Sequence, residues 1–134
     1  MTDRRRPFVA DERGSGSMLT LMTVALTLMA FLVVLVVGSY LIADHRAVAA
    51  ADRAALSGAR AHGAPGGRQQ EASSACETAR RVAELNGARM TGCRITGDRA
   101  DYVVQVTVVV DVGVLWPGLP AQVPGSAHAG RLSG

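Results

Sequence analysis

The sequence contains no lysine, because all 14 basic residues among its 134 are arginines. A Schiff-base mechanism and a phosphate-binding P-loop both require a lysine, so the sequence excludes both. Aromatic residues make up only 4% of the chain, which leaves few rings to stack on nucleic-acid bases. The net charge of +3 comes from arginines spread along the chain and not from one basic patch, so we expect no nucleic-acid partner.

Catalytic motifs are also missing. The sequence has no Gly-x-Ser-x-Gly, His-Glu-x-x-His or Gly-x-Gly-x-x-Gly motif, which are typical of hydrolases, zinc proteases and dinucleotide-binding enzymes. Asp98 and Asp101 stand before a predicted strand, where aspartates commonly accept backbone hydrogen bonds in a turn. We therefore predict that the protein is not an enzyme, with no catalytic residue, no cofactor, no bound metal and no small-molecule substrate.

Charge is scarce, at 19% of residues against about 25% in a typical soluble domain. The deficit lies in one stretch, since no residue from 14 to 43 is charged and residues 18–43 are almost entirely apolar. As a helix rising about 1.5 Å per residue, that apolar stretch would be about 39 Å long, which exceeds the roughly 30 Å of hydrocarbon in a bilayer. We predict a transmembrane helix over residues 15–43, after a basic leader of residues 1–14.

The flanks of this segment indicate its orientation. Four arginines precede it. A cleavable secretory signal would have a shorter apolar stretch, of about 7–15 residues, with a small-residue cleavage site directly after it. Because arginines favour the cytoplasmic side of a membrane helix, we expect the N-terminus in the cytoplasm. The chain is then a single-pass protein of the cell membrane, with residues 44–134 extracytoplasmic.

Beyond the membrane, the sequence predicts a helical stalk and a second helix. Residues 44–62 are rich in alanine and lack proline, so we expect the membrane helix to continue to about Ala61. Residues 63–69 form a linker, because glycine and proline break a helix there. The second helix is predicted from about Gln70 to Leu85, with apolar side chains along one stripe and an ion pair between Glu77 and Arg81, four residues apart.

Two strands should follow this helix. One is short, over residues 93–96, and the other covers residues 102–112, where valines alternate with other residues in the period of two that is typical of a sheet with one covered face. Residues 122–131 fit only a poor third strand. We therefore predict an α+β fold: one long transmembrane and stalk helix, a small extracytoplasmic globule of helix plus antiparallel sheet over residues 70–116, and a weakly structured tail over residues 117–134.

Small residues recur every fourth position along the end of the apolar segment and the stalk. Small side chains at this spacing allow a second helix to approach closely, so we interpret the row as a candidate packing contact with partner helices. The alternative is an alanine-rich helix with a solvated arginine face. The row consists of Ser39, Ala43, Ala47, Ala51, Ala55 and Ala59.

The two cysteines, Cys76 and Cys93, fall in the predicted second helix and first strand, on the oxidising side of the membrane. The part of the chain after the stalk has only about 70 residues, too few for a core that dispenses easily with a covalent link, so a disulfide is the first interpretation. A metal site with histidine ligands and a pair of reduced, buried thiols are the alternatives. No Cys-x-x-Cys or His-x-x-x-His spacing favours the metal site.

Short motifs mark the start of the apolar helix and the stalk, namely Arg13-Gly14-Ser15 and Ala50-Ala51-Asp52-Arg53-Ala54-Ala55-Leu56. In this order they resemble the TadE/TadG-like family, which are pilin-like membrane proteins of tight-adherence (Flp) pilus assembly. The chain is most similar to an actinobacterial TadE-like subgroup encoded near a helicase and secretion genes. Members of that subgroup have a cysteine in a helix after the stalk, an Asn-Gly at its end (here Asn86-Gly87), a second cysteine and a valine-rich strand.

The resemblance implies a structural, pilin-like component of a Flp pilus or related secretion apparatus. It would pack laterally through its N-terminal helix against other pilin-like or Tad assembly membrane proteins. A prepilin peptidase would cut between Gly14 and Ser15, and Leu19 would then occupy the fifth position, where such mature chains usually carry a glutamate. The alternative is a signal-anchored extracytoplasmic binding module that contacts the envelope or membrane partners without entering a filament.

Overall fold

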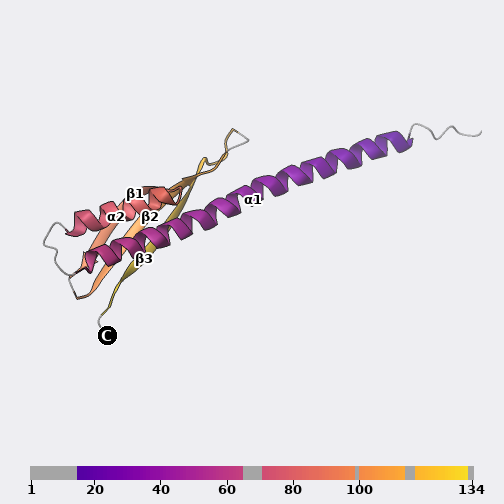
Figure 1. The fold of residues 1–134 in the computed structure, drawn as a ribbon. Helices are drawn as coiled ribbons and strands as arrows, with labels where there is room; N and C mark the ends of the chain where they lie inside the picture. Colours follow the sequence, from indigo (N-terminus) through magenta and orange to yellow (C-terminus); the bar gives the residue numbers. More distant parts are fainter. Residues whose placement is uncertain (1–14, 65–70, 99, 114–116, 133–134) are drawn as a thin grey trace, which may run out of the picture. The chain divides into compact units, whose positions relative to one another are not determined.

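The computed structural model describes residues 15–64, 71–98, 100–113 and 117–132. Within these residues the chain forms two helices and three strands (Figure 1): α1 (Ser15–His62), α2 (Glu71–Leu85), β1 (Arg89–Gly97), β2 (Tyr102–Asp111) and β3 (Gln122–Arg131). This architecture confirms the predicted α+β class with a long N-terminal apolar helix. The chain divides into two compact units, Met1–Val36 and Val37–Gly134.

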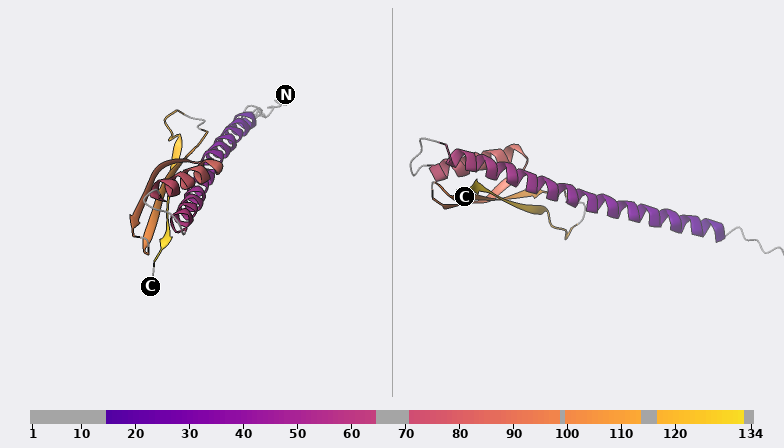
Figure 2. Two further views of the ribbon diagram at one scale, coloured as in Figure 1. Left: turned by 60° about the vertical axis from the view of Figure 1, so that its left-hand side comes forward. Right: turned by 90° about the horizontal axis from the view of Figure 1, so that it is seen from below.

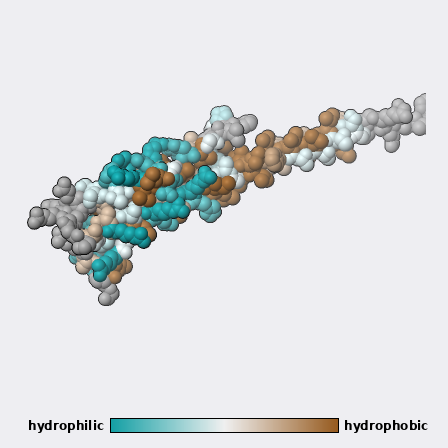
Figure 3. Space-filling view, viewed as in Figure 1, coloured by the Kyte–Doolittle hydropathy of each residue, from teal (hydrophilic) through white to brown (hydrophobic). Residues whose placement is uncertain are grey.

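The first unit contains the N-terminal part of α1, whose large apolar side chains are exposed, for example Leu19 at 68% and Phe31 at 60%. Figure 3 shows hydrophobic side chains over this part of the helix. The hydroxyls of Thr20, Thr23 and Thr27 donate hydrogen bonds of 2.9 Å to helix carbonyls three or four residues earlier. Their polar groups are therefore satisfied without water, as a lipid environment requires. By length and composition, α1 is able to cross a membrane.

The second unit is built on a three-stranded antiparallel sheet in the order β1-β2-β3. β2 is central, and alternate residues from Tyr102 to Val110 are buried because one face of the sheet is covered. The C-terminal part of α1 and α2 lie on that face (Figure 2). The core is made almost entirely of alanines from the two helices and valines from β2, among which Val104, Val106 and Val108 are fully buried.

Two glycines allow the helices and the sheet to approach closely. A Cβ placed on Gly58 of α1 would lie 3.3 Å from the Ala79 Cβ of α2 and 3.4 Å from Val104 Cγ1 of β2. A Cβ placed on Gly125 of β3 would lie 2.5 Å from the carbonyl carbon of Ala47 in α1. The backbone of β3 therefore rests directly on the backbone of α1.

The C-terminal segment differs from its prediction as a weakly structured tail. Residues 122–131 form β3, which pairs with β2 from Asp111↔Gln122 to Tyr102↔Arg131. Its glycine, alanine and serine residues are poor strand formers in general, but only small side chains fit against α1 where Gly125 and Ala127 are buried. The small residues that made residues 122–131 a poor strand candidate are thus those that the packing of β3 against α1 requires.

The strand over residues 93–96 was also predicted too short. β1 begins at Arg89, which pairs with Val109, and a register shift between Met90 and Gly92 interrupts the period of two that would have revealed the longer strand. The continuous helix expected to about Ala61 ends at His62, and the second helix begins at Glu71. Most of the predicted linker, residues 65–69, lies outside the described residues.

Candidate functional site

The row of small residues lies in the core of the second unit. Ala47, Ala51 and Ala55 are fully buried, and Ala43 and Ala59 are 6% exposed. Of these alanines, Ala47, Ala51, Ala55 and Ala59 pack in one cluster with the valines of β2 and the alanines of α2, whereas Ser39, at the start of the row, is exposed. The close packing that the spacing indicated is therefore present, but its partners are the sheet and α2 of the same chain. A partner helix would have to displace the sheet to reach the four buried alanines beyond Ala43.

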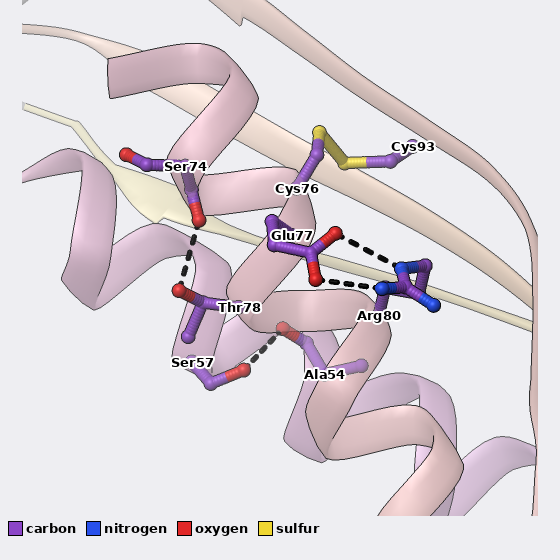
Figure 4. The surroundings of a disulfide bond; sticks show 8 residues. All are labelled: Ala54, Ser57, Ser74, Cys76, Glu77, Thr78, Arg80 and Cys93. Carbon is purple, nitrogen blue, oxygen red and sulfur yellow. Dashed lines mark hydrogen bonds and ion pairs between the residues drawn. A yellow bond between two sulfur atoms is a disulfide. The ribbon is translucent and has the colours of Figure 1, made fainter. Parts of the chain in front are cut away.

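Cys76 of α2 and Cys93 of β1 form a disulfide, with their Cα atoms 5.9 Å apart (Figure 4). The bond joins α2 to the edge strand β1, 17 residues away in sequence. Closing a loop of this length stabilises a fold by roughly 3 kcal/mol in the chain-entropy model. Both sulfur atoms are used in the bond, so neither can act as a metal ligand while it is intact.

The exposed face of α2 carries an ion-pair network around Arg80. Its guanidinium donates to Glu77 at 2.6 Å and to Glu84 at 2.7 Å (Figure 4 shows the Glu77 pair). The hydrogen bond from Arg80 lowers the pKa of Glu77, with a further electrostatic contribution from Arg81. Glu77 in turn raises the pKa of Arg80. The close ion pair of Glu77 is thus with Arg80, three residues later, whereas the predicted partner Arg81 contributes an electrostatic attraction.

The end of α1 is fixed by polar contacts that the sequence did not reveal. The buried Tyr102 hydroxyl of β2 donates to the carbonyl oxygen of Ala59 at 2.8 Å. The ring of His62 meets that of Tyr102 edge-on, with centroids 4.7 Å apart. Arg53 Nη1 donates to Asn86 Oδ1 at 2.5 Å, which ties α1 to the turn after α2. These pairs are 33 to 43 residues apart in sequence, so no local pattern marks them.

A further contact links the last turns of the apolar segment to the connection between β2 and β3. The hydroxyl of Tyr40 donates to the carbonyl oxygen of Pro120 at 2.6 Å. The ends of this connection are held together by a hydrogen bond of 2.8 Å from the Val112 N–H to the Ala121 carbonyl. The connection thus reaches a residue of α1 that precedes the predicted end of the membrane segment at Ala43.

The predicted cleavage site is only partly described by the structure. Gly14 lies outside the described residues, and Ser15 is the first residue of α1. Among the described residues, no group of three metal-ligating side chains is gathered in one place.

Residues 14–61 match the family Tad, "Putative Flp pilus-assembly TadE/G-like". The match begins one residue before α1 and ends one residue before its end, and it does not include α2 or the sheet. No curated protein and no solved structure matches the chain.

The TadE/G-like match supports the family suggested by the sequence motifs. Together with an apolar helix able to cross a membrane, it supports a pilus-related membrane component. The family description concerns pilus assembly and names no catalytic activity.

Proposed function

We propose that this chain is a single-pass, pilin-like membrane component of a Flp (tight-adherence) pilus or a related secretion apparatus, of the actinobacterial TadE-like subgroup. The observation that carries the proposal is that the TadE/G-like match covers one helix, α1, that has two roles. Its first part presents exposed apolar side chains suited to lipid, and its last part forms the core of a disulfide-linked globule.

The disulfide and the arginines of the leader both favour one orientation. Disulfides form and persist in oxidising compartments, and positive charge near a membrane helix favours the cytoplasmic side. An N-terminus in the cytoplasm and a globule outside satisfy both tendencies. Other pilin-like or Tad assembly membrane proteins are then the expected partners.

Lateral packing in such an assembly would use the apolar segment before Ala43. The stalk alanines are covered by the sheet, whereas Leu28 and its neighbours in the apolar segment are exposed. A photo-crosslinking residue at position 28 is expected to trap another pilin-like chain in the native membrane. The same residue at position 56 should give no crosslink between chains, because Leu56, although 47% exposed, lies in the stalk beyond Ala43. Equal intermolecular crosslinking at both positions would contradict this mode of packing.

Processing at Gly14 tests membership of the pilin-like group. Intact mass spectrometry of protein from the native host is expected to show a chain that starts at Ser15, and Gly14→Leu should retain the leader. Gly16→Leu is the matched control, because a Cβ at Gly16 meets no atom within 4 Å and the cleavage position is unchanged. A wild-type chain that keeps Met1 in the native host would favour the plain membrane anchor of the alternative hypothesis.

A further inference from the structure

A basic groove lies on α1 directly after the apolar segment. It has a volume of about 330 Å³, and five of its lining residues come from α1 and one from the turn after α2. All of them belong to the second unit. The lining residues are Ile42, His45, Arg46, Ala49, Arg53 and Asn86.

The charges in this groove have one sign. The guanidinium groups of Arg46 and Arg53 line it beside the His45 imidazole, and none of its described lining residues is a carboxylate. Arg53 is held by Asn86, as described above. For Arg46, the described part of the chain supplies neither an ion pair nor a side-chain hydrogen bond. Seven residues separate Arg46 from Arg53, so both project from the same face of α1.

The position of the groove along the chain matches the surface of a membrane. Ile42 belongs to the last turn of the apolar segment, and Arg46 follows its end at Ala43 by about 4.5 Å of helix rise. The Cα–Cβ bonds of a helix tilt toward its N-terminus, which for Arg46 is the direction of that segment. The Tyr40–Pro120 contact shows that the globule itself reaches this level. Tyrosine is enriched at membrane–water interfaces.

We propose that this groove binds the phosphate headgroup of an anionic phospholipid in the leaflet on the side of the globule. A guanidinium binds phosphate through paired, charge-assisted hydrogen bonds, and Ile42 supplies an apolar border for the start of the acyl chains. In the proposed orientation Arg46 and Arg53 lie on the extracytoplasmic flank of the membrane helix, where positive charge is disfavoured. A contact with an anionic lipid would give these arginines a role there. The inference rests on the proposed membrane anchoring but not on leader cleavage or filament formation.

Native mass spectrometry of the full-length chain in mixed micelles tests the groove, with phosphatidylglycerol and phosphatidylcholine as the two probes. We expect preferential retention of phosphatidylglycerol. Arg46→Gln should weaken it about 5-fold, and the double variant with Arg53→Gln up to about 30-fold, from about 1 kcal/mol per basic residue near a lipid surface. Arg60→Gln is the matched control, because Arg60 lies on the same face but about 21 Å of helix rise beyond Arg46, and it does not line the groove.

Three results would overturn the inference. The first is equal retention of the two lipids by the wild-type chain. The second is an Arg60→Gln effect as large as that of Arg46→Gln, which would indicate a general charge effect. The third is displacement of the lipid by millimolar inorganic phosphate, which would indicate a site for free anions.

Membrane integration is measured separately by alkaline carbonate extraction. A chain released by carbonate would overturn both the anchoring and the lipid site. A chain that stays integrated but shows no lipid preference would overturn the lipid site alone.

Discussion

The contact between Gly125 and α1 gives the sharpest test of the fold. A Cβ at Gly125 would lie 2.5 Å from the carbonyl carbon of Ala47, 2.6 Å from its oxygen and 2.9 Å from its Cβ. Two of these atoms are backbone, so they cannot move aside by a rotamer change. Gly125→Ala must therefore push β3 away from α1, and overpacking of this kind costs about 1–3 kcal/mol.

Hydrogen exchange of the β2 amides in the full-length chain, measured by mass spectrometry in detergent, reports this loss. A destabilisation of 1–3 kcal/mol corresponds to roughly 5- to 150-fold faster exchange where exchange follows the opening equilibrium. Gly113→Ala is the matched control, because it lies in the β2–β3 connection and its Cβ would meet no atom within 4 Å. If Gly125→Ala exchanges no faster than Gly113→Ala, β3 does not rest on Ala47 and the packing described here is wrong.

Four further changes probe the rest of the unit. Tyr102→Phe should destabilise it by only about 0.5–1.5 kcal/mol in denaturant unfolding, because the Ala59 carbonyl keeps a second hydrogen bond from a backbone N–H. Reduction of the disulfide should lower the free energy of unfolding by about 3 kcal/mol, measured by hydrogen exchange with and without reductant. Arg80→Gln should raise the pKa of Glu77 toward its ordinary value of 4.5 in an NMR titration. Because its pKa is lowered in the folded chain, ionised Glu77 stabilises the fold at pH values above its ordinary pKa of 4.5. This stabilisation is lost as the pH falls through the lowered pKa, and Arg80→Gln should lose less stability over that pH range. Because Ala51 is fully buried, Ala51→Leu should overpack the core at a cost of about 1–3 kcal/mol and speed hydrogen exchange of the β2 amides. An unchanged exchange rate would contradict the place of Ala51 in the core.

The features that could be predicted from the sequence are those with a local signal. The uncharged run up to Ala43 and the alternation of valines in β2 are visible within a few residues, and both are present in the structure. The disulfide was predictable from the small size of the globule and the number of cysteines. The TadE/G-like match over residues 14–61 includes Gly14-Ser15 and the whole stalk motif.

The features that the sequence concealed depend on partners far along the chain. β3 has the composition of a loop, and its assignment as a strand requires knowledge that α1 lies against Gly125 and Ala127. The alanine row indicated close packing, but spacing alone does not distinguish a partner helix from a sheet in the same chain. The basic groove joins Arg46 to Asn86, which no spacing rule connects.

The position of the alanine row restricts how such a chain can assemble. From Ala47 to Ala59 one side of α1 packs against β2, β3 and α2, so this part of the helix already has neighbours within its own chain. Hydrocarbon offers no hydrophobic drive between helices, so in the proposed assembly contacts within the membrane would come from the shape of the exposed side chains before Ala43. Because the segment from residue 16 to Phe31 holds only exposed side chains, the proposed assembly would use a different stretch of α1 from the one that folds the globule. Substitutions near Leu28 should therefore alter assembly while leaving β2 exchange unchanged, and substitutions near Ala51 should alter β2 exchange first.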